Sequence, residues 1–128
     1  MFKVKTWRGA AASFGAQIAI EERLFISGWD LRWHLGLMTE STKLNDNTGI
    51  AIGYVNDEAV CTVVDLKIAM AFCREAHRRN GYCSKALKGL MKNRPGEKSA
   101  PTACAGIEGS ENFWALNGVP LGYYHRGI

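Results

Sequence analysis

The stretch AMAFCREAHRRNGYCSKALKGLM, residues 69 to 91, decides the fold. Its first residues continue an alternating apolar segment that begins at Leu66, which is typical of a β-strand. A basic, glycine-containing turn follows, and after it comes a helix in which Leu87, Leu90 and Met91 share one face. A strand, a turn and a helix therefore follow one another directly.

The turn within this stretch has the chemistry of an anion site. A turn that opens a helix exposes backbone N–H groups at the positive end of the helix dipole. Gly81 lets the backbone approach a ligand closely, Arg78 and Arg79 add positive charge, and Ser84 can supply either an N-cap or a hydroxyl contact. We therefore expect a phosphate-bearing ligand here.

The segments on either side predict a sheet built mainly from consecutive strands. We expect strands over residues 2–7, 50–55, 59–64, 66–73, 102–106 and 121–125, and helices over 9–28, 29–37 and 110–117, with a loop over 39–49. Phe14, Ile18 and Phe25 are expected on one face of the first helix, and Asn56-Asp57-Glu58 is a hairpin turn signal. The fold class is α/β (α+β), with one mostly antiparallel sheet flanked by helices.

Length and composition indicate one folded domain over residues 1–128. Apolar residues make up 47% and charged residues 22%, which is a globular balance. No apolar run approaches the roughly 20 residues that cross a bilayer, and the N-terminus lacks the apolar core of a signal peptide. We expect a cytoplasmic protein without membrane contact.

The four cysteines are spread singly, without the CxxC pairs of a zinc or redox site. We interpret Cys61, Cys73, Cys83 and Cys104 as reduced thiols in small buried positions, and we expect no metal. The net charge of +4 favours an anionic partner, and a polyanionic small molecule would satisfy the basic cluster near Arg74 to Arg79.

The segment RRNGYCSKAL, residues 78–87, resembles the cofactor motif of the GNAT N-acetyltransferase superfamily. That motif is (Arg or Gln)-x-x-Gly-x-(Gly or Ala), with Arg78 first, Gly81 fourth and Cys83 sixth. In that family the loop wraps the pyrophosphate of coenzyme A with backbone amides. The resemblance implies that acetyl-CoA is the co-substrate and that these residues bind it: Phe72, Cys73, Arg78, Arg79, Asn80, Gly81, Tyr82, Cys83 and Ser84.

Two further passages resemble the same family. AFCREAH, residues 71–77, is similar to the splayed strand whose backbone holds the pantetheine arm and the thioester oxygen, so the resemblance gives that role to Phe72 and Cys73. FWALNGVPLGYY, residues 113–124, resembles the family's Phe-Tyr-x-x-x-Gly-Phe passage. The likeness covers about residues 48 to 126 and implies that residues 1–48 form the acceptor side and 49–128 the cofactor-binding core.

Two residues depart from the family pattern. Cys83 adds a side chain where the phosphate is expected to come close. Trp114 replaces a tyrosine that commonly protonates the departing coenzyme A thiolate in relatives, and indole cannot supply that proton. Tyr124 is our candidate general acid, with Tyr123 and Tyr82 as alternatives; each of these tyrosines also has a plain structural interpretation.

The amine acceptor needs a base, because only the neutral amine attacks. We choose Asp65 as the candidate, ahead of Glu58 in the hairpin turn and His77 beside the basic turn. A strand-end salt bridge with Lys67 is the structural alternative for Asp65. Glu108 and Glu111 would be favoured near a helix start whatever the function.

The sequence therefore predicts transfer of an acetyl group from acetyl-CoA to a primary amine by direct attack, on a protein lysine, a protein N-terminus or a small molecule. The alternative is a weakly active or inactive GNAT-like scaffold that binds a macromolecule, and Cys83 and Trp114 favour it. Nucleic-acid binding through Arg74, the basic turn and the helix lysines depends on charge alone and is not expected.

Two expectations concern the ends of the chain. Few residues follow the Gly-Tyr-Tyr segment, so an exposed sheet edge is expected to pair with a second copy in a homodimer. In the first third, Trp29, Trp33 and His34 either line an acceptor cleft or pack in the core.

Overall fold

The computed structural model describes residues 1–24, 48–65, 68–92, 102–104, 113 and 121–122. Its elements are, in chain order, β1 (Phe2–Arg8), the 3-10 helix η1 (Gly9–Ala11), α1 (Ala12–Glu21), β2 (Gly49–Val55), β3 (Glu58–Asp65), β4 (Ile68–Cys73), the 3-10 helix η3 (Glu75–His77), α3 (Tyr82–Lys92), β5 (Thr102–Cys104) and β6 (Leu121–Gly122). The expected helix over 29–37 lies outside the described residues, as does that over 110–117 apart from the helical Phe113.

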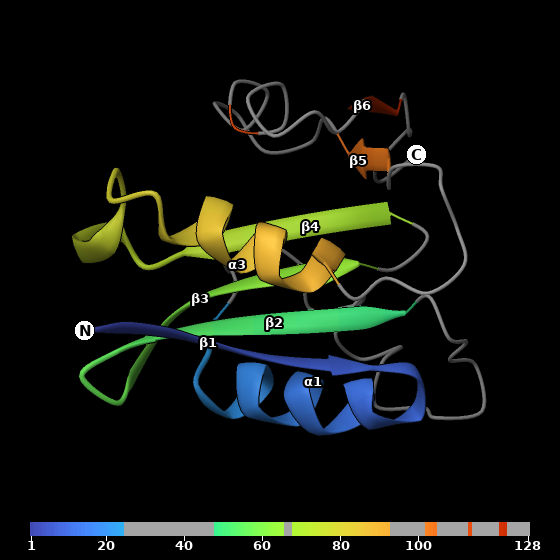
Figure 1. The fold of residues 1–128 in the computed structure, drawn as a ribbon, viewed down its shortest axis with the longest axis horizontal. Coiled ribbons are helices and arrows are strands. Elements are labelled where there is room, and N and C mark those ends of the chain that lie inside the picture. The colour runs from blue at the N-terminus through green and yellow to red at the C-terminus, as the bar shows by residue number, and fades with distance from the viewer. Residues whose placement is uncertain (25–47, 66–67, 93–101, 105–112, 114–120, 123–128) are drawn as a thin grey trace.

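The strands form one mixed sheet in the order β1-β2-β3-β4-β5-β6. β1 to β4 are antiparallel neighbours, whereas β4 and β5, and β5 and β6, are parallel. The mostly antiparallel sheet is as predicted. Within the described residues β5 pairs with β4 only at Ile68 and Ala69, so the second half of β4 is paired on its β3 side alone. Figure 1 shows β5 and β6 beyond β4, at the edge opposite β1.

The hairpin between β2 and β3 turns at two residues. Asn56 and Asp57 have φ angles of 50° and 69°, the left-handed pair that a tight hairpin turn requires and that Asn and Asp tolerate best. Glu58, predicted in the turn, is instead the first residue of β3. The register also shifts between Gly53 and Tyr54, which leaves Val60 as the extra residue of a β-bulge on β3.

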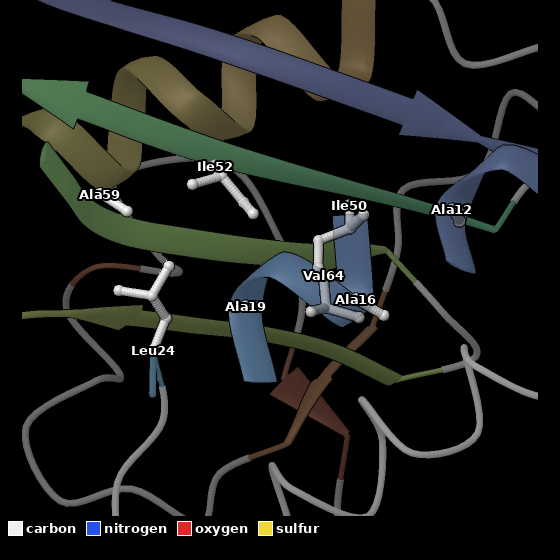
Figure 2. Close-up of a cluster of buried hydrophobic side chains, with 8 residues drawn as sticks. All are labelled: Ala12, Ala16, Ala19, Leu24, Ile50, Ile52, Ala59 and Val64. Atoms are coloured by element: carbon white, nitrogen blue, oxygen red, sulfur yellow. The ribbon is translucent and has the colours of Figure 1, made fainter. Parts of the chain in front are cut away.

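The two helices cover opposite faces of the sheet. Successive residues of a strand point to opposite faces, so they belong to two different buried clusters. On the α1 face, Figure 2 shows a buried cluster of Ala12, Ala16, Ala19, Leu24, Ile50, Ile52, Ala59 and Val64. The cluster on the other face consists of Ala51, Val60, Cys61, Val63, Ala86, Leu87 and Leu90. As predicted, the helix lysines of α3, which crosses the sheet in Figure 1, are exposed opposite Leu87 and Leu90.

The predicted apolar face of α1 is wrong for Phe14, whereas Ile18 packs partly buried against the core and Phe25 lies outside the described residues. The side chain of Phe14 is 68% exposed, and the face against the sheet consists of Ala12, Gly15, Ala16 and Ala19. Small residues bury here because the helix lies very close to β1 and β2: a Cβ added to Gly15 would lie 2.4 Å from Ile50 Cγ2. Packing, and not side-chain hydrophobicity, selects the buried face.

α1 also ends earlier than predicted, at Glu21. Arg23 has a φ of 55°, its N–H donates to Ile20 O, and the N–H of Leu24 donates to Ala19 O at 2.9 Å. These two bonds form a Schellman motif, which terminates a helix, and the buried Leu24 side chain supplies its usual apolar contact. Among the described residues, no helix is long and apolar enough to span a bilayer.

Candidate functional site

The loop between β4 and α3 brings most of the sequence-predicted binding residues together. After β4 ends at Cys73, the chain makes the short helix η3 and reaches α3 through residues 78–81. Arg79 and Gly81 both have left-handed backbones, with φ of 69° and 73°. For a non-glycine residue this conformation costs roughly 1–2 kcal/mol, so Arg79 is a strained position next to a helix start.

Gly81 leaves open space in front of the helix. A Cβ built on it would meet no atom within 4 Å, and its left-handed φ disfavours other residues. The Lys85 N–H donates to Gly81 O at 3.1 Å in the first turn of α3, and the N–H groups of residues 82 and 83 come before the first carbonyl that the helix itself supplies. An anion placed at this end of α3 would meet these groups and the positive end of the dipole.

Side chains fix the shape of the loop. The Nε of Arg78 donates to Cys73 O at 2.8 Å, and its guanidinium lies over the Phe72 ring, 5.9 Å from the centroid. The amide nitrogen of Asn80 donates to His77 O at 3.1 Å. Arg78 therefore joins the loop to the end of β4, while the Arg79 side chain is exposed to solvent.

The backbone polarity at the end of β4 follows from its pairing with β3. The Arg74 N–H donates to Val60 O at 2.8 Å, and Cys73 is the register partner of Cys61. Antiparallel pairs alternate between hydrogen-bonded and non-hydrogen-bonded, so Cys73 belongs to the second kind and Phe72 to the first. The N–H of Cys73 thus points away from β3, whereas that of Phe72 lies in the ladder.

The first turn of α3 carries three of the predicted binding residues. The Tyr82 ring stacks on Phe2 of β1, with centroids 4.4 Å apart and planes at 10°. The Cys83 thiol donates to Phe72 O at 3.4 Å, so this side chain is turned toward the sheet and does not cover the outer face of the loop. Ser84 lies inside the helix, which begins at Tyr82, so the N-cap that we allowed for it is wrong.

Asp65 lies at the other end of the sheet. Its carboxylate is 2.9 Å from Arg8 Nη1, and a second nitrogen of Arg8 donates to Leu90 O near the C-terminal end of α3. Asp65 is four residues along β3 from Cys61, which is about 13 Å at strand spacing. The structure therefore does not bring Asp65 to the loop. It shows an ion pair between Asp65 and Arg8, and the predicted partner Lys67 lies outside the described residues.

Other sequence candidates are distributed as follows. Glu58 is exposed at the hairpin, and His77 is the last residue of η3, with its ring 6.4 Å from that of Tyr82. The remaining named candidates lie outside the described residues: Trp29, Trp33, His34, Lys67, Glu108, Glu111, Trp114, Tyr123 and Tyr124. Among the described residues, no group of three or more His, Cys, Asp or Glu side chains could hold a metal ion.

Arg74 belongs to the framework of the fold. Its Nε donates to Ala59 O at 2.8 Å, its Nη2 donates to Glu22 O at 2.6 Å, and the same nitrogen is 3.7 Å from the Glu22 carboxylate. Arg74 therefore links the β-bulge of β3 to the end of α1. Because these contacts occupy its guanidinium, Arg74 is not available as one of the basic residues considered for nucleic-acid binding.

Sequence reasoning missed the three-element cysteine group beside the loop. Cys61, Cys73 and Cys83 come from β3, β4 and α3 and pack in the same cluster. The available signal was that Cys61 and Cys73 lie on consecutive predicted strands, where antiparallel pairing can place them opposite each other.

Comparison with known proteins addresses the fold. No family model and no curated protein matches the sequence. Among solved structures, ribosomal-protein-alanine N-acetyltransferase from Brucella melitensis biovar Abortus 2308 is similar, with a TM-score of 0.54 and 12% identity, over 100% of this chain and 98% of that chain. The chain has a GNAT-like fold. At this identity the likeness shows the fold alone, and that fold is the one the residue 78–87 motif predicted.

Proposed function

We propose that the chain binds acetyl-CoA at the β4–α3 loop and transfers the acetyl group to a primary amine. The observation that carries the proposal is the open, left-handed Gly81 at the start of α3, next to the half of β4 that is paired on its β3 side alone among the described residues. The loop offers an anion site, and the adjoining strand offers free backbone for an extended ligand.

The pyrophosphate of coenzyme A would lie against residues 79–84. The N–H groups of the first turn of α3 would donate to phosphate oxygens, and the exposed Arg79 would add charge. Arg78, which is committed to Cys73 O, would act by holding the loop in shape. Because the Cys83 thiol is turned toward Phe72 O, its side chain leaves the phosphate side of the loop clear.

The thioester would lie beside the end of β4. Of the two residues predicted there, Cys73 has the N–H that points away from β3, so it is the better donor to the thioester oxygen. A fixed N–H at that oxygen stabilises the charge that develops when an amine attacks the carbonyl carbon. Phe72 would contribute through its ring, which lies under Arg78.

The proton-transfer residues stay predictions. Asp65, the predicted base, forms a buried ion pair with Arg8 and lies away from the loop. Tyr124, the predicted acid, lies outside the described residues. The single domain, the homodimer and the cytoplasmic location also stay predictions.

A protein N-terminus is the acceptor class to test first, because the structurally similar enzyme is named for acetylating the alanine of a ribosomal protein.

A second candidate is a scaffold that keeps the cofactor site without efficient chemistry. The position of Asp65 favours it, because the ion pair with Arg8 holds this carboxylate at the end of β3 that is away from the loop. The two candidates differ in turnover and agree on cofactor binding.

Calorimetric titration with acetyl-CoA and, separately, with coenzyme A tests the proposal. We expect micromolar binding at one site per chain for both ligands. Acetylation of a peptide that begins with alanine, and of lysate proteins, followed by mass spectrometry, then separates the enzyme from the scaffold. Absence of binding at millimolar ligand would contradict both candidates.

A further inference from the structure

Three thiols meet where β3, β4 and α3 come together. Cys61 and Cys73 are direct cross-strand partners, and the bond from the Arg74 N–H to Val60 O makes theirs a non-hydrogen-bonded pair. The Cα atoms of such pairs are about 4.5 Å apart, which brings their side chains close. Cys83 joins them from the first turn of α3: it packs in the same cluster, and its thiol donates to the carbonyl of Phe72, the residue before Cys73, at 3.4 Å. All three are free cysteines.

The three thiols differ in access. Cys61 is fully buried, whereas Cys73 and Cys83 are partly exposed. A peroxide has to reach only Cys73, which is partly exposed at the end of β4, because Cys83 reacts afterwards with the oxidised Cys73 sulfur. Cys83 is also on a helix end that adjoins a loop, so it has more freedom to move than two residues fixed in a strand ladder.

The three thiols differ in acidity as well. The hydrogen bond from Cys83 and the positive charge of Arg78 lower the pKa of Cys73, and they outweigh the opposing effect of its burial. Contacts with Cys61 and Cys73, together with burial, raise the pKa of Cys83. Cys73 is thus the thiol of the pair that is favoured as thiolate, and the thiolate is the form that attacks a peroxide.

We propose that Cys73 and Cys83 form a reactive dithiol that hydroperoxides oxidise to an intrachain disulfide. The Cys73 thiolate attacks the outer oxygen of the hydroperoxide and the O–O bond breaks, which gives a sulfenic acid on Cys73 and an alkoxide, or hydroxide from hydrogen peroxide. This leaving group takes a proton from water and departs as the alcohol or as water. The Cys83 sulfur then attacks the Cys73 sulfur, the S–S bond forms, and the hydroxide leaves with the Cys83 proton as water. Two thiols are oxidised by two electrons, and the peroxide is reduced by two.

The disulfide would connect the end of β4 to the first turn of α3. These two points bound residues 74–82, so the bond would close that segment covalently. The inference does not depend on any ligand of the loop, because it concerns the chemistry of the two thiols alone.

Peptide mapping of the folded wild-type chain tests the proposal. The protein is treated with one equivalent of hydrogen peroxide, remaining thiols are blocked with N-ethylmaleimide, and the chain is digested with trypsin without reduction. We expect the peptides of residues 68–74 and 80–85 to be found joined, with the loss of two hydrogen atoms. A joined pair that contains Cys61 or Cys104 as the main product, or oxidation of single thiols without joining, would overturn the proposal.

Two variants sharpen the result. Cys61→Ala should leave the joined peptides unchanged, and their loss in this variant would contradict the pairing. Cys83→Ser removes the resolving thiol, so the Cys73 peptide should carry a sulfenic acid that dimedone traps; trapping mainly on another cysteine would contradict the role of Cys73. The unfolded wild-type chain, which should give mixed pairings, shows that the folded structure directs the reaction.

Discussion

The guanidinium of Arg8 in β1 holds the carboxylate of Asp65 in β3 at 2.9 Å, although the two residues are 57 positions apart in the chain. The Asp65 side chain is 1% exposed and that of Arg8 is 16% exposed. Arg8 also reaches Leu90 O in α3. One ion pair therefore connects two strands and a helix, and removing one partner leaves a buried charge uncompensated.

We expect Asp65→Ala to lower the free energy of unfolding by about 3 kcal/mol, the cost typical of breaking a buried pair. Urea denaturation measures it. Arg8→Ala should cost a similar amount, and the double variant should cost clearly less than the sum of both. Strictly additive costs would show that the two residues do not stabilise each other, and the case for Asp65 as a base would then be stronger.

Gly81→Asp and Gly81→Asn form a matched pair that tests the phosphate loop. The two side chains have nearly the same size, and both tolerate the left-handed backbone of Gly81. Only Asp brings negative charge to the start of α3. We expect Asp to weaken coenzyme A binding about tenfold or more relative to Asn, since tenfold corresponds to only about 1.4 kcal/mol of repulsion. Calorimetry measures both, and wild-type affinity in both folded variants would contradict the loop assignment.

The reactivity of Cys73 should depend on pH in a way that reports its environment. Iodoacetamide reacts with the thiolate, so the rate rises as pH increases through the pKa. Because the pKa of Cys73 is lowered from the ordinary value of 9.0, half-maximal alkylation of the peptide 68–74 should occur below pH 9.0. Cys83→Ala removes the main cause of the shift and should move that midpoint upward. A midpoint at or above pH 9.0 in the wild-type chain would contradict the environment described.

Two helical glycines should respond to alanine with opposite signs. By helix propensity alone, each Gly→Ala change in a helix stabilises by about 1 kcal/mol. Gly89→Ala in α3 should follow this rule, because its added Cβ would meet only Val4 Cγ1, at 3.5 Å. Gly15→Ala in α1 should instead destabilise by about 1–3 kcal/mol, because its Cβ would lie 2.4 Å from Ile50 Cγ2 and 2.6 Å from Trp7 Cε3. Thermal denaturation gives both signs, and a stabilised Gly15→Ala protein would contradict the close approach of α1.

Local pattern determined much of this protein. Alternating apolar residues specify β2, β3 and β4, the Asn56-Asp57 pair specifies their first hairpin, and the glycine-containing basic turn specifies the β4–α3 loop. Each of these signals depends on the conformation of a few neighbouring residues, so sequence alone expresses it. The motif at residues 78–87 therefore predicted the GNAT-like fold that the comparison supports.

Only the tertiary structure decided which side chains from different elements contact one another. The pairing of Asp65 with Arg8, the commitment of Arg74 to Glu22 and Ala59, and the meeting of Cys61, Cys73 and Cys83 all join residues from different elements. The small-residue face of α1 likewise depends on how closely the helix approaches β1 and β2, which propensity does not encode. Packing of the whole core sets the distances between elements, so the side-chain contacts of the site can be identified only in the folded chain.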